Sequence, residues 1–552
     1  MAKRWLNNCI LNHVSCNRLS NRALNLPTRL IDLGYTTSAF DLSSMHLIES
    51  RRLAPGTKYA TLSHCWGTKT SLELTRGSIN DLLVHIPETG LCKTFFDSAV
   101  AAKELGIRYL WIDRLCIIQH DEEDWRTESA NMQEVYSNAF LNIAATAARD
   151  GDDGCFMERN PLLLEKCFVR ADWDGDAERY NGLYQLVTIN RFLDCIEGAP
   201  LNSRGWVVQE RYLSRRILQF CFQRLFWECC ESASCEVEPD PGSRFAQKKP
   251  HLAPLKSWTY SGPERLKDVD SVHWAWCFMV SKFSKCKLTH KSDKLPAIAG
   301  ITKDFEPLLG ENVVGLWKRF IEYELLWSTS SKHPDDEPTR TSFSCVPSWS
   351  WASLDKSIYF HQSHVLNTVD SCGRISYIVA EVLNMPTDIT WHVETDEMEK
   401  GELTIKGQLI KVQLDPWQTG KTIFSGINGK SVDQICSDFE ADCHMDRKDQ
   451  YHDTSMRTIY CLPILSQVGG SLPSRHTVTG LLLEPSGTQS SFKRIGLFRV
   501  TGGSIHFLRQ GDGPALHGGS YNNTIDRVLQ YEFRGKEVTD IWAAHQFAIV
   551  II

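Results

Sequence analysis

The stretch YATLSHCWG (residues 59–67) contains a short apolar run that ends in a group of polar and aromatic residues. Two later stretches also place tryptophan and polar residues beside an apolar run: YLWIDRLCIIQHD (109–121) and SRGWVVQERYLSRRILQF (203–220). In an open α/β sheet, ligands bind outside the carboxyl ends of the strands. The three stretches therefore predict one site that is assembled from separate parts of the chain.

Short apolar runs and amphipathic segments alternate from about 57 to 230, which is typical of strands joined by helices around a parallel sheet. We expect strands over 59–63, 107–112, 140–146, 216–220 and 225–228. Helices are expected over 94–105, with Thr94 as cap, and from Asp121, with Trp125, Met132, Tyr136 and Ala139 on one face. A third, short helix carries Trp206 and Glu210. The pattern predicts a doubly wound, flavodoxin-like α/β domain.

The chain has 552 residues, too many for one hydrophobic core. We expect four parts: an N-terminal segment (1–56), the α/β domain (57–230), a helical connector (250–335) and a mostly β C-terminal domain (340–552). A polar, proline-rich stretch from Pro250 to Pro263 is expected to be a linker. The β character of ISYIVAEV, ELTIKGQLIKV, VTGLLLE, RIGLFRV and HQFAIVII indicates the last part.

Composition narrows the classes of partner and location. A formal net charge of -7 provides no broad basic face, so we expect no nucleic-acid partner. No stretch approaches the ~18 apolar residues of a membrane span, and the first fifteen residues contain no apolar core of signal-peptide length. A cytoplasmic location with no membrane span is expected. Most of the 19 cysteines are then expected to be reduced and buried.

Cys9, His13 and Cys16 have a spacing that could supply three zinc ligands. Structural zinc sites take four ligands, and the sequence shows no fourth ligand nearby. Packing of this segment against the following domain is therefore the favoured interpretation, and we predict no metal.

One chemistry that these residues could carry is nucleophilic catalysis by a cysteine and a histidine. Cys65 or Cys116 would be the nucleophile, with His64 as base and Asp113 orienting it. His64 and Cys65 are neighbours and point to opposite faces of a strand, so they cannot pair with each other. Cys116 lies between apolar residues, which raises a thiol pKa. His120 is the other histidine that the fold could bring to Cys116.

A second chemistry is cleavage of a glycosidic C–N bond. A leaving group that already carries positive charge, such as the nicotinamide of NAD, needs no general acid, and one carboxylate can stabilise the oxocarbenium-like carbon. Glu210 is the candidate catalytic residue, Trp206 its aromatic wall and Arg204 a phosphate or carboxylate ligand. Ser63, Trp66, Gly67 and Asp113 complete the predicted binding residues.

Structural roles compete with these assignments. Trp66, Trp111 and Trp206 could belong to the core, and Ser63 could be an ordinary strand-end hydroxyl. Asp113 could only cap the loop that follows it. Glu210 could pair on the surface with Arg204, Arg211 or Arg215, where ion pairs contribute little.

The three stretches resemble the signature blocks of the fungal heterokaryon-incompatibility (HET) domain family. The matching residues are Tyr59, Leu62, Ser63, Trp66 and Gly67, then Leu110, Trp111, Ile112, Asp113, Cys116, Ile117, Gln119, Met132, Tyr136 and Ala139, then Arg204, Gly205, Trp206, Gln209, Glu210, Leu213, Ser214 and Arg216. LPTRLID, LTHKSDKLPAIAG (288–300) and VPSWSWASLD (346–355) are also typical of full-length members.

This resemblance implies a role in fungal non-self recognition, where HET domains trigger cell death when incompatible strains fuse. It implies homo-oligomerisation on activation and a protein partner from an incompatible strain. The HET domain is considered a distant relative of TIR domains, some of which hydrolyse NAD through the glutamate of a W-C-x-x-E pattern. Trp206 and Glu210 keep that interval, while Val207 replaces the Cys and Arg204 replaces a serine. No cofactor is then required, and NAD would be the substrate.

Two other functions stay open at this point. The HET domain could be a non-catalytic module that assembles with itself while the β-rich domain recognises a partner. Alternatively, the chain could be a HET-like enzyme recruited to a specialised-metabolite pathway.

Overall fold

The computed structural model divides into two compact units, residues 1–267 with 286–304 and residues 268–285 with 305–552. The described residues are 1–17, 25–35, 38–67, 71–164, 167–175, 180–186, 193–237, 239, 269–329, 346–360, 374–385, 391–392, 397–398, 401–415, 423–425, 441–445, 457–469, 477–486, 491–501 and 546–551. The expected linker at 250–263 lies outside them, and the boundaries of the four expected parts remain predictions.

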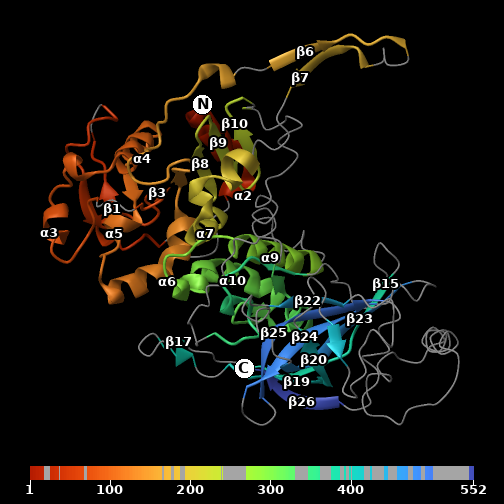
Figure 1. Ribbon diagram of the computed structural model, residues 1–552. Coiled ribbons are helices and arrows are strands. Elements are labelled where there is room, and N and C mark those ends of the chain that lie inside the picture. Colours follow the sequence, from red (N-terminus) through yellow and green to blue (C-terminus); the bar gives the residue numbers. More distant parts are fainter. Residues whose placement is uncertain are drawn as a thin grey trace, which may run out of the picture. The chain divides into compact units, whose positions relative to one another are not determined.

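The first unit is built on an eight-stranded sheet with the order β10-β9-β8-β5-β3-β4-β1-β2 (Figure 1). Its strands are β1 (Arg29–Asp32), β2 (His46–Glu49), β3 (Tyr59–Ser63), β4 (Tyr109–Trp111), β5 (Leu141–Ala144), β8 (Arg216–Phe220), β9 (Leu225–Cys229) and β10 (Ala233–Cys235). β4, β3, β5 and β8 run parallel, while β1, β2, β9 and β10 are added through antiparallel pairings. The expected α/β sheet is present, but it is mixed rather than wholly parallel.

The helices of this unit are α1 (Ala2–Asn12), α2 (Val14–Asn17), α3 (Ile79–Leu82), α4 (Lys93–Glu104), α5 (Asp113–Cys116), α6 (Glu122–Asn138) and α7 (Gly205–Leu213). Asp121 caps α6 as predicted, because its side chain accepts a hydrogen bond from the Asp124 N–H. Two expectations were wrong. Cys92, not Thr94, precedes α4, and Trp125 on α6 is 42% exposed rather than part of the buried face.

The order of the parallel strands decides where a site can form. The four parallel strands lie side by side in the order β4-β3-β5-β8. Numbered by their place in the chain, they are the second, first, third and fourth parallel strands. The strand order therefore reverses between β3 and β5, and the crevice outside their carboxyl ends is where open α/β sheets bind ligands. Every residue of β3, β5 and β8 is buried, as expected for strands covered on both faces.

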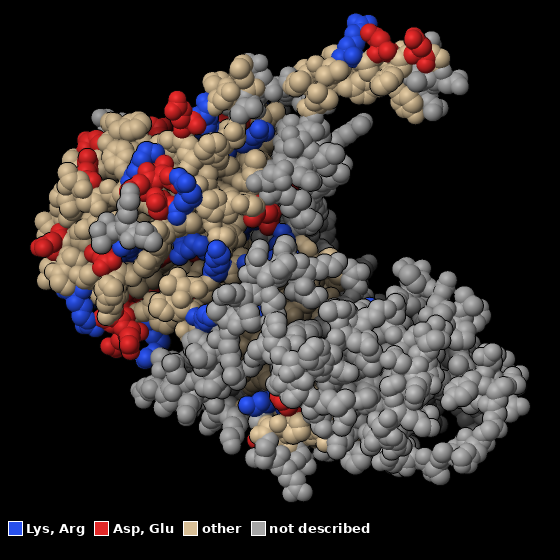
Figure 2. All heavy atoms as spheres, in the orientation of Figure 1, with Lys and Arg blue, Asp and Glu red and all other residues tan. Residues whose placement is uncertain are grey.

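A β-hairpin of strands β6 (Cys167–Ala171) and β7 (Gly182–Leu186) extends away from the main sheet of this unit (Figure 1). On the face shown in Figure 2, the described Lys and Arg residues of the first unit are interspersed with Asp and Glu, so that face carries no broad basic patch.

The second unit is mostly β, as expected. It contains α9 (Val269–Phe283), α11 (Ile321–Glu324) and the short strands β11 (Asn312–Val313), β12 (Leu316–Trp317), β13 (Ser328–Thr329) and β14 (Ile358–Tyr359); α10 (Pro296–Leu309) crosses the boundary between the units. A further sheet contains β15 (Arg374–Ile378), β16 (Glu381–Asn384), β19 (Leu403–Gln408), β20 (Ile410–Asp415), β21 (Ile423–Ser425), β22 (Ala441–Met445), β23 (Arg457–Gly469), β24 (Thr477–Pro485), β25 (Ser491–Thr501) and β26 (Gln546–Ile551). β17 (Trp391–His392) and β18 (Glu397–Met398) form a separate pair.

Buried tryptophans provide much of the core of the second unit. Trp276, Trp317 and Trp327 are fully buried, whereas Trp274 is 43% exposed. Across the part of the chain that the structure describes, no helix has the length and apolar character needed to cross a bilayer.

Candidate functional site

Ser63 ends β3 at the point where the strand order reverses. It pairs in register with Ala144 of β5, and its hydroxyl accepts a hydrogen bond from Asn142 Nδ2 at 3.0 Å. Ser63 and Asn142 are both buried. The predicted hydroxyl therefore lies inside the sheet edge and is held by the neighbouring strand.

Trp66 and Asp113 connect the first two sequence blocks. Asp113 follows β4 and begins α5, and its Oδ2 accepts a hydrogen bond from Trp66 Nε1 at 2.8 Å. Its Oδ1 accepts a second bond from the Arg114 backbone N–H at 2.7 Å. The Arg114 guanidinium lies over the Trp66 ring, 5.2 Å from its centre. Asp113 is the first residue of α5 rather than its cap; its side chain bonds the next N–H and also holds the loop after β3.

Gly67 follows Trp66 with a positive φ of +67°, a conformation that residues with a Cβ rarely adopt. A Cβ at this position would lie 2.4 Å from the Cβ of Asp150. Gly67 therefore allows the loop after β3 to pack closely on the loop after β5. It lies at the sheet edge and is exposed.

His64 lies between these groups and is fully enclosed. Its Nδ1 is 3.7 Å from Asp113 Oδ1, and its ring meets Phe95 edge-to-face with the ring centres 4.9 Å apart. Nε2 has no hydrogen-bond partner among the described residues. Burial lowers the pKa of His64 to about 4, because desolvation disfavours the imidazolium form. At neutral pH the ring is therefore uncharged.

Arg204 brings the third block to the first. It occupies the N-cap position of α7, and its Nη1 donates a hydrogen bond to the His64 backbone carbonyl. All three sequence blocks therefore meet at the carboxyl edge of the parallel strands, as the sequence predicted.

Glu210 lies in the second turn of α7, and its side chain is directed into the interior, where the residue is only 5% exposed. Burial raises the pKa of its carboxyl to about 7, and the nearby Asp113 acts in the same direction. The positive charge of Arg204 opposes this shift, as do hydrogen-bonding contacts from the hydroxyls of Ser63 and Tyr136. Its Oε2 has no hydrogen-bond partner among the described residues.

Glu210 does not form the expected ion pair on the surface, because the residue is buried. Arg211, one of its expected surface partners, instead donates two 2.9 Å hydrogen bonds to the carboxylate of Glu228 and one to Glu197. Arg211 and Glu228 are themselves buried, so this pair secures α7 to β9.

Trp206, the expected aromatic wall, is half-buried one helical turn before Glu210. Its Nε1 donates a hydrogen bond to Asp293 Oδ2 at 3.1 Å. The neighbouring Gln209 side chain accepts a 2.7 Å bond from the Gly300 N–H. One face of α7 is therefore fixed to the 286–304 segment of the same unit.

The two cysteines considered as nucleophiles are both buried. Cys65 packs in an apolar cluster with Ala144, Leu201, Val207 and Ile217, and burial raises the pKa of its thiol. Burial also raises the pKa of Cys116 to about 12. A thiolate is the reactive form, so neither environment favours nucleophilic catalysis. His120 is exposed, and its Nε2 lies 3.3 Å from Glu73 Oε1.

Tyr136 and Asn142 are site residues that the sequence did not single out. Tyr136 was predicted as part of the buried face of α6 and as a residue matching the HET blocks, but not as a site residue. It is fully buried beside Glu210, and its phenol pKa is raised well above 10 by burial and by that carboxylate. A polar residue within the apolar strand 140–146 was the available signal for Asn142. Among the described residues, the side-chain groups with metal-ligand spacing do not include Glu210 or Asp113.

Residues 59–210 match the family model described as Heterokaryon incompatibility protein (HET). This part of the chain is therefore a HET domain. No curated protein and no solved structure matches the chain.

Proposed function

We propose that this chain is a heterokaryon-incompatibility protein, a cell-death effector or signalling protein whose HET domain hydrolyses NAD, with Glu210 as the catalytic carboxylate. One observation carries the proposal: a single buried carboxyl, with an oxygen that has no described partner, lies at the meeting point of three separate blocks. A buried carboxylate costs stability unless it is paired, so its position favours a functional role.

The chemistry needs only one acidic group. Water attacks the anomeric carbon of the nicotinamide riboside, the C–N bond breaks, and its electron pair neutralises the pyridinium ring. The products are nicotinamide, ADP-ribose and a proton. The Glu210 carboxylate would stabilise the oxocarbenium-like carbon and accept a hydrogen bond from a ribose hydroxyl. A cationic substrate also favours the ionised carboxylate, because opposite charge lowers a carboxyl pKa.

The order of the parallel strands supports this assignment. The strand order β4-β3-β5-β8 is that of flavodoxin-like sheets, which begin with the second, first, third and fourth strands of the chain. In those sheets a nucleotide cofactor binds where the strand order reverses. Ser63 ends β3 at that point, and Tyr136 and Glu210 lie beside it. We therefore infer a flavodoxin-like, TIR-like domain whose ligand site is at this edge.

A substrate can reach Glu210 only if the residues that enclose its carboxyl move. A cavity of about 1190 Å³ is lined by residues that include Lys93, Arg149 and Arg159, cations of the kind that bind a pyrophosphate. Each of them is paired with a carboxylate (Asp97, Asp153 and Glu236), which a bound pyrophosphate would have to displace. Glu210 is not among its lining residues, and its carboxyl is enclosed. We infer that the resting protein is closed and that assembly with further copies opens the site, so hydrolysis increases with protein concentration.

The test is to incubate the purified full chain with NAD over a range of protein concentrations and to measure nicotinamide by chromatography. Wild-type protein should release nicotinamide, and Glu210→Gln should release none while keeping the far-UV circular dichroism of the wild type. Glu123→Gln, on the exposed face of α6, is the matched control and should retain activity. No release by the wild type at any concentration, or equal release by Glu210→Gln, would disprove the proposal.

A second function, a self-assembling module without catalysis, is favoured by the β6–β7 hairpin. Apolar side chains along it are exposed: Phe168 52%, Trp173 56%, Leu183 71% and Leu186 53%. No third strand pairs with either member within the described residues, so both strands have unpaired edges. Phe168→Asp with Leu183→Asp should reduce the oligomer mass measured by light scattering. An unchanged mass would argue against assembly through the hairpin.

A further inference from the structure

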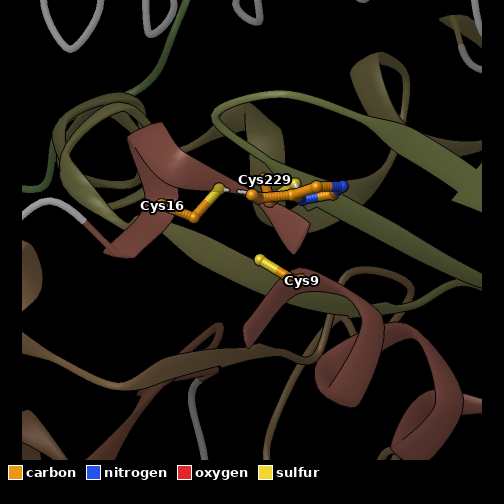
Figure 3. A group of neighbouring side chains, drawn as sticks. Cys9, Cys16 and Cys229 are labelled. Atoms are coloured by element: carbon orange, nitrogen blue, oxygen red, sulfur yellow. Dashed lines mark hydrogen bonds between the residues drawn. The ribbon is translucent and has the colours of Figure 1, made fainter. Parts of the chain in front are cut away.

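Three thiols and one imidazole meet beside the main sheet of the first unit, away from the HET site residues. Cys9 lies on α1, His13 and Cys16 follow in the adjoining segment, and Cys229 is the last residue of β9. All four are buried, and their candidate ligand atoms lie within 4.8 Å of one another. Figure 3 shows Cys9, Cys16 and Cys229 arranged around a common space.

The two separations from the His13 ring are close to those of a tetrahedral zinc site. His13 Nδ1 is 3.3 Å from Cys229 Sγ and 3.9 Å from Cys16 Sγ. Zinc–sulfur bonds of ~2.3 Å and zinc–nitrogen bonds of ~2.0 Å place tetrahedral ligand atoms roughly 3.5–3.8 Å apart. Three Cys and one His is also one of the ligand sets found in structural zinc sites.

Groups around the cluster are suited to bound thiolates. Arg216 Nε donates to Cys9 Sγ at 3.2 Å, and the Ser232 backbone N–H donates to Cys229 Sγ at 3.3 Å. Three thiolates around Zn²⁺ leave one net negative charge, which the Arg216 guanidinium offsets. Donors of this kind orient and stabilise the ligands of metal sites.

We propose that Cys9, His13, Cys16 and Cys229 bind one structural Zn²⁺ ion. The site is closed, because four protein ligands leave no position for substrate. The ion joins the N-terminal helices to β9, elements that are more than 200 residues apart in the chain. The same segment is also held by hydrogen bonds from Trp5 Nε1 to the Pro239 carbonyl and from Arg216 to the Cys16 carbonyl.

A second buried group, His273, Cys277 and Glu324, provides an internal comparison. It has only three members, and His273 Nε2 already forms a 2.8 Å hydrogen bond with Glu324 Oε1. Its contacts are those of a hydrogen-bonded pair next to a thiol. We therefore assign a single zinc ion to the described part of the chain.

The test is the metal content of the full chain, produced without a polyhistidine tag in zinc-supplemented cells and measured by mass spectrometry of the elements. One zinc per chain is expected. Removing zinc with a chelator should lower the melting temperature, and adding zinc should restore it. Cobalt(II) in the same site should give the visible bands of a tetrahedral ion and the near-ultraviolet absorption of bound thiolates.

Variants separate the four ligands from other cysteines. Cys229→Ser should lose most of its zinc, whereas Cys155→Ser, which removes a buried thiol of the same unit, should keep one zinc per chain. If Cys229→Ser does not fold, the zinc content and cobalt spectrum of the wild type decide the question. Wild-type protein that contains no zinc and takes up none, or a disulfide between two of the three cysteines, would overturn the assignment.

Discussion

Replacing Glu210 by Gln tests the central feature of the proposed site, because it removes a buried charge and keeps the shape of the side chain. The buried carboxyl has a pKa raised from 4.5 to about 7, and desolvation is the main cause. The folded protein therefore binds this proton more tightly than the unfolded chain does. The wild type has its full stability below about pH 4.5 and loses the contribution of this group as the pH rises through 7.

The size of the effect follows from the same shift. At about 1.4 kcal/mol for each unit, a pKa moved from 4.5 to about 7 costs the folded state on the order of 3 kcal/mol once the group is ionised. Glu210→Gln does not ionise. Relative to the wild type, the variant should therefore gain on the order of 3 kcal/mol of stability between pH 5 and pH 8.

Urea unfolding at pH 5 and pH 8 measures this difference, and the second unit, if its transition is separate, serves as an internal reference. Glu123→Gln, which changes an exposed carboxylate on α6, is the control and should show little dependence on pH. A Glu210→Gln protein that gains no stability over the wild type between pH 5 and pH 8 would show that the buried carboxyl carries no charge penalty. The Glu210 carboxyl would then lack the destabilised charge on which the proposed catalytic role depends.

Three further results are expected. The kcat/KM for NAD should rise with pH through about 7 and then level off, because the ionised form of Glu210 is the active one. A kcat/KM that falls over this pH range would contradict that role. Arg211→Met should cost about 3–5 kcal/mol in urea unfolding, since it leaves the buried Glu228 carboxylate unpaired, and a loss below about 1 kcal/mol would count against that pair. Gly67→Ala should lower stability by at least about 1 kcal/mol in thermal unfolding, because of its positive φ and its approach to Asp150; unchanged stability would show that the loop relaxes freely.

Local patterns predicted the elements that carry the site. The strands 59–63 and 216–220 and the helix with Trp206 and Glu210 follow from apolar runs and helical spacing, and each is present in the structure. The meeting of the three blocks could also be predicted, because parallel strands place their carboxyl ends at one edge. The HET family match covers residues 59–210, in agreement with the resemblance seen in those blocks.

Other features depended on packing. The antiparallel strands at both edges of the sheet could not be read from apolar runs, since strand direction is set by pairing. The exposed side of Trp125 and the bond from Trp206 to Asp293 depend on which neighbouring segment covers each helix face. The expected four-part division still rests on sequence alone.

The sequence by itself determined the HET blocks, the candidate carboxylate Glu210 and the spacing of Cys9, His13 and Cys16, because these depend on residue type and short spacing. From that spacing alone, packing without a metal was the favoured interpretation. Only the tertiary structure decided that Glu210 is buried beside Ser63 and Tyr136, and that Cys229 joins Cys9, His13 and Cys16. The physical reason is the same in both cases. Desolvation and ligand geometry depend on atoms that are distant in the chain and become neighbours only when the sheet forms.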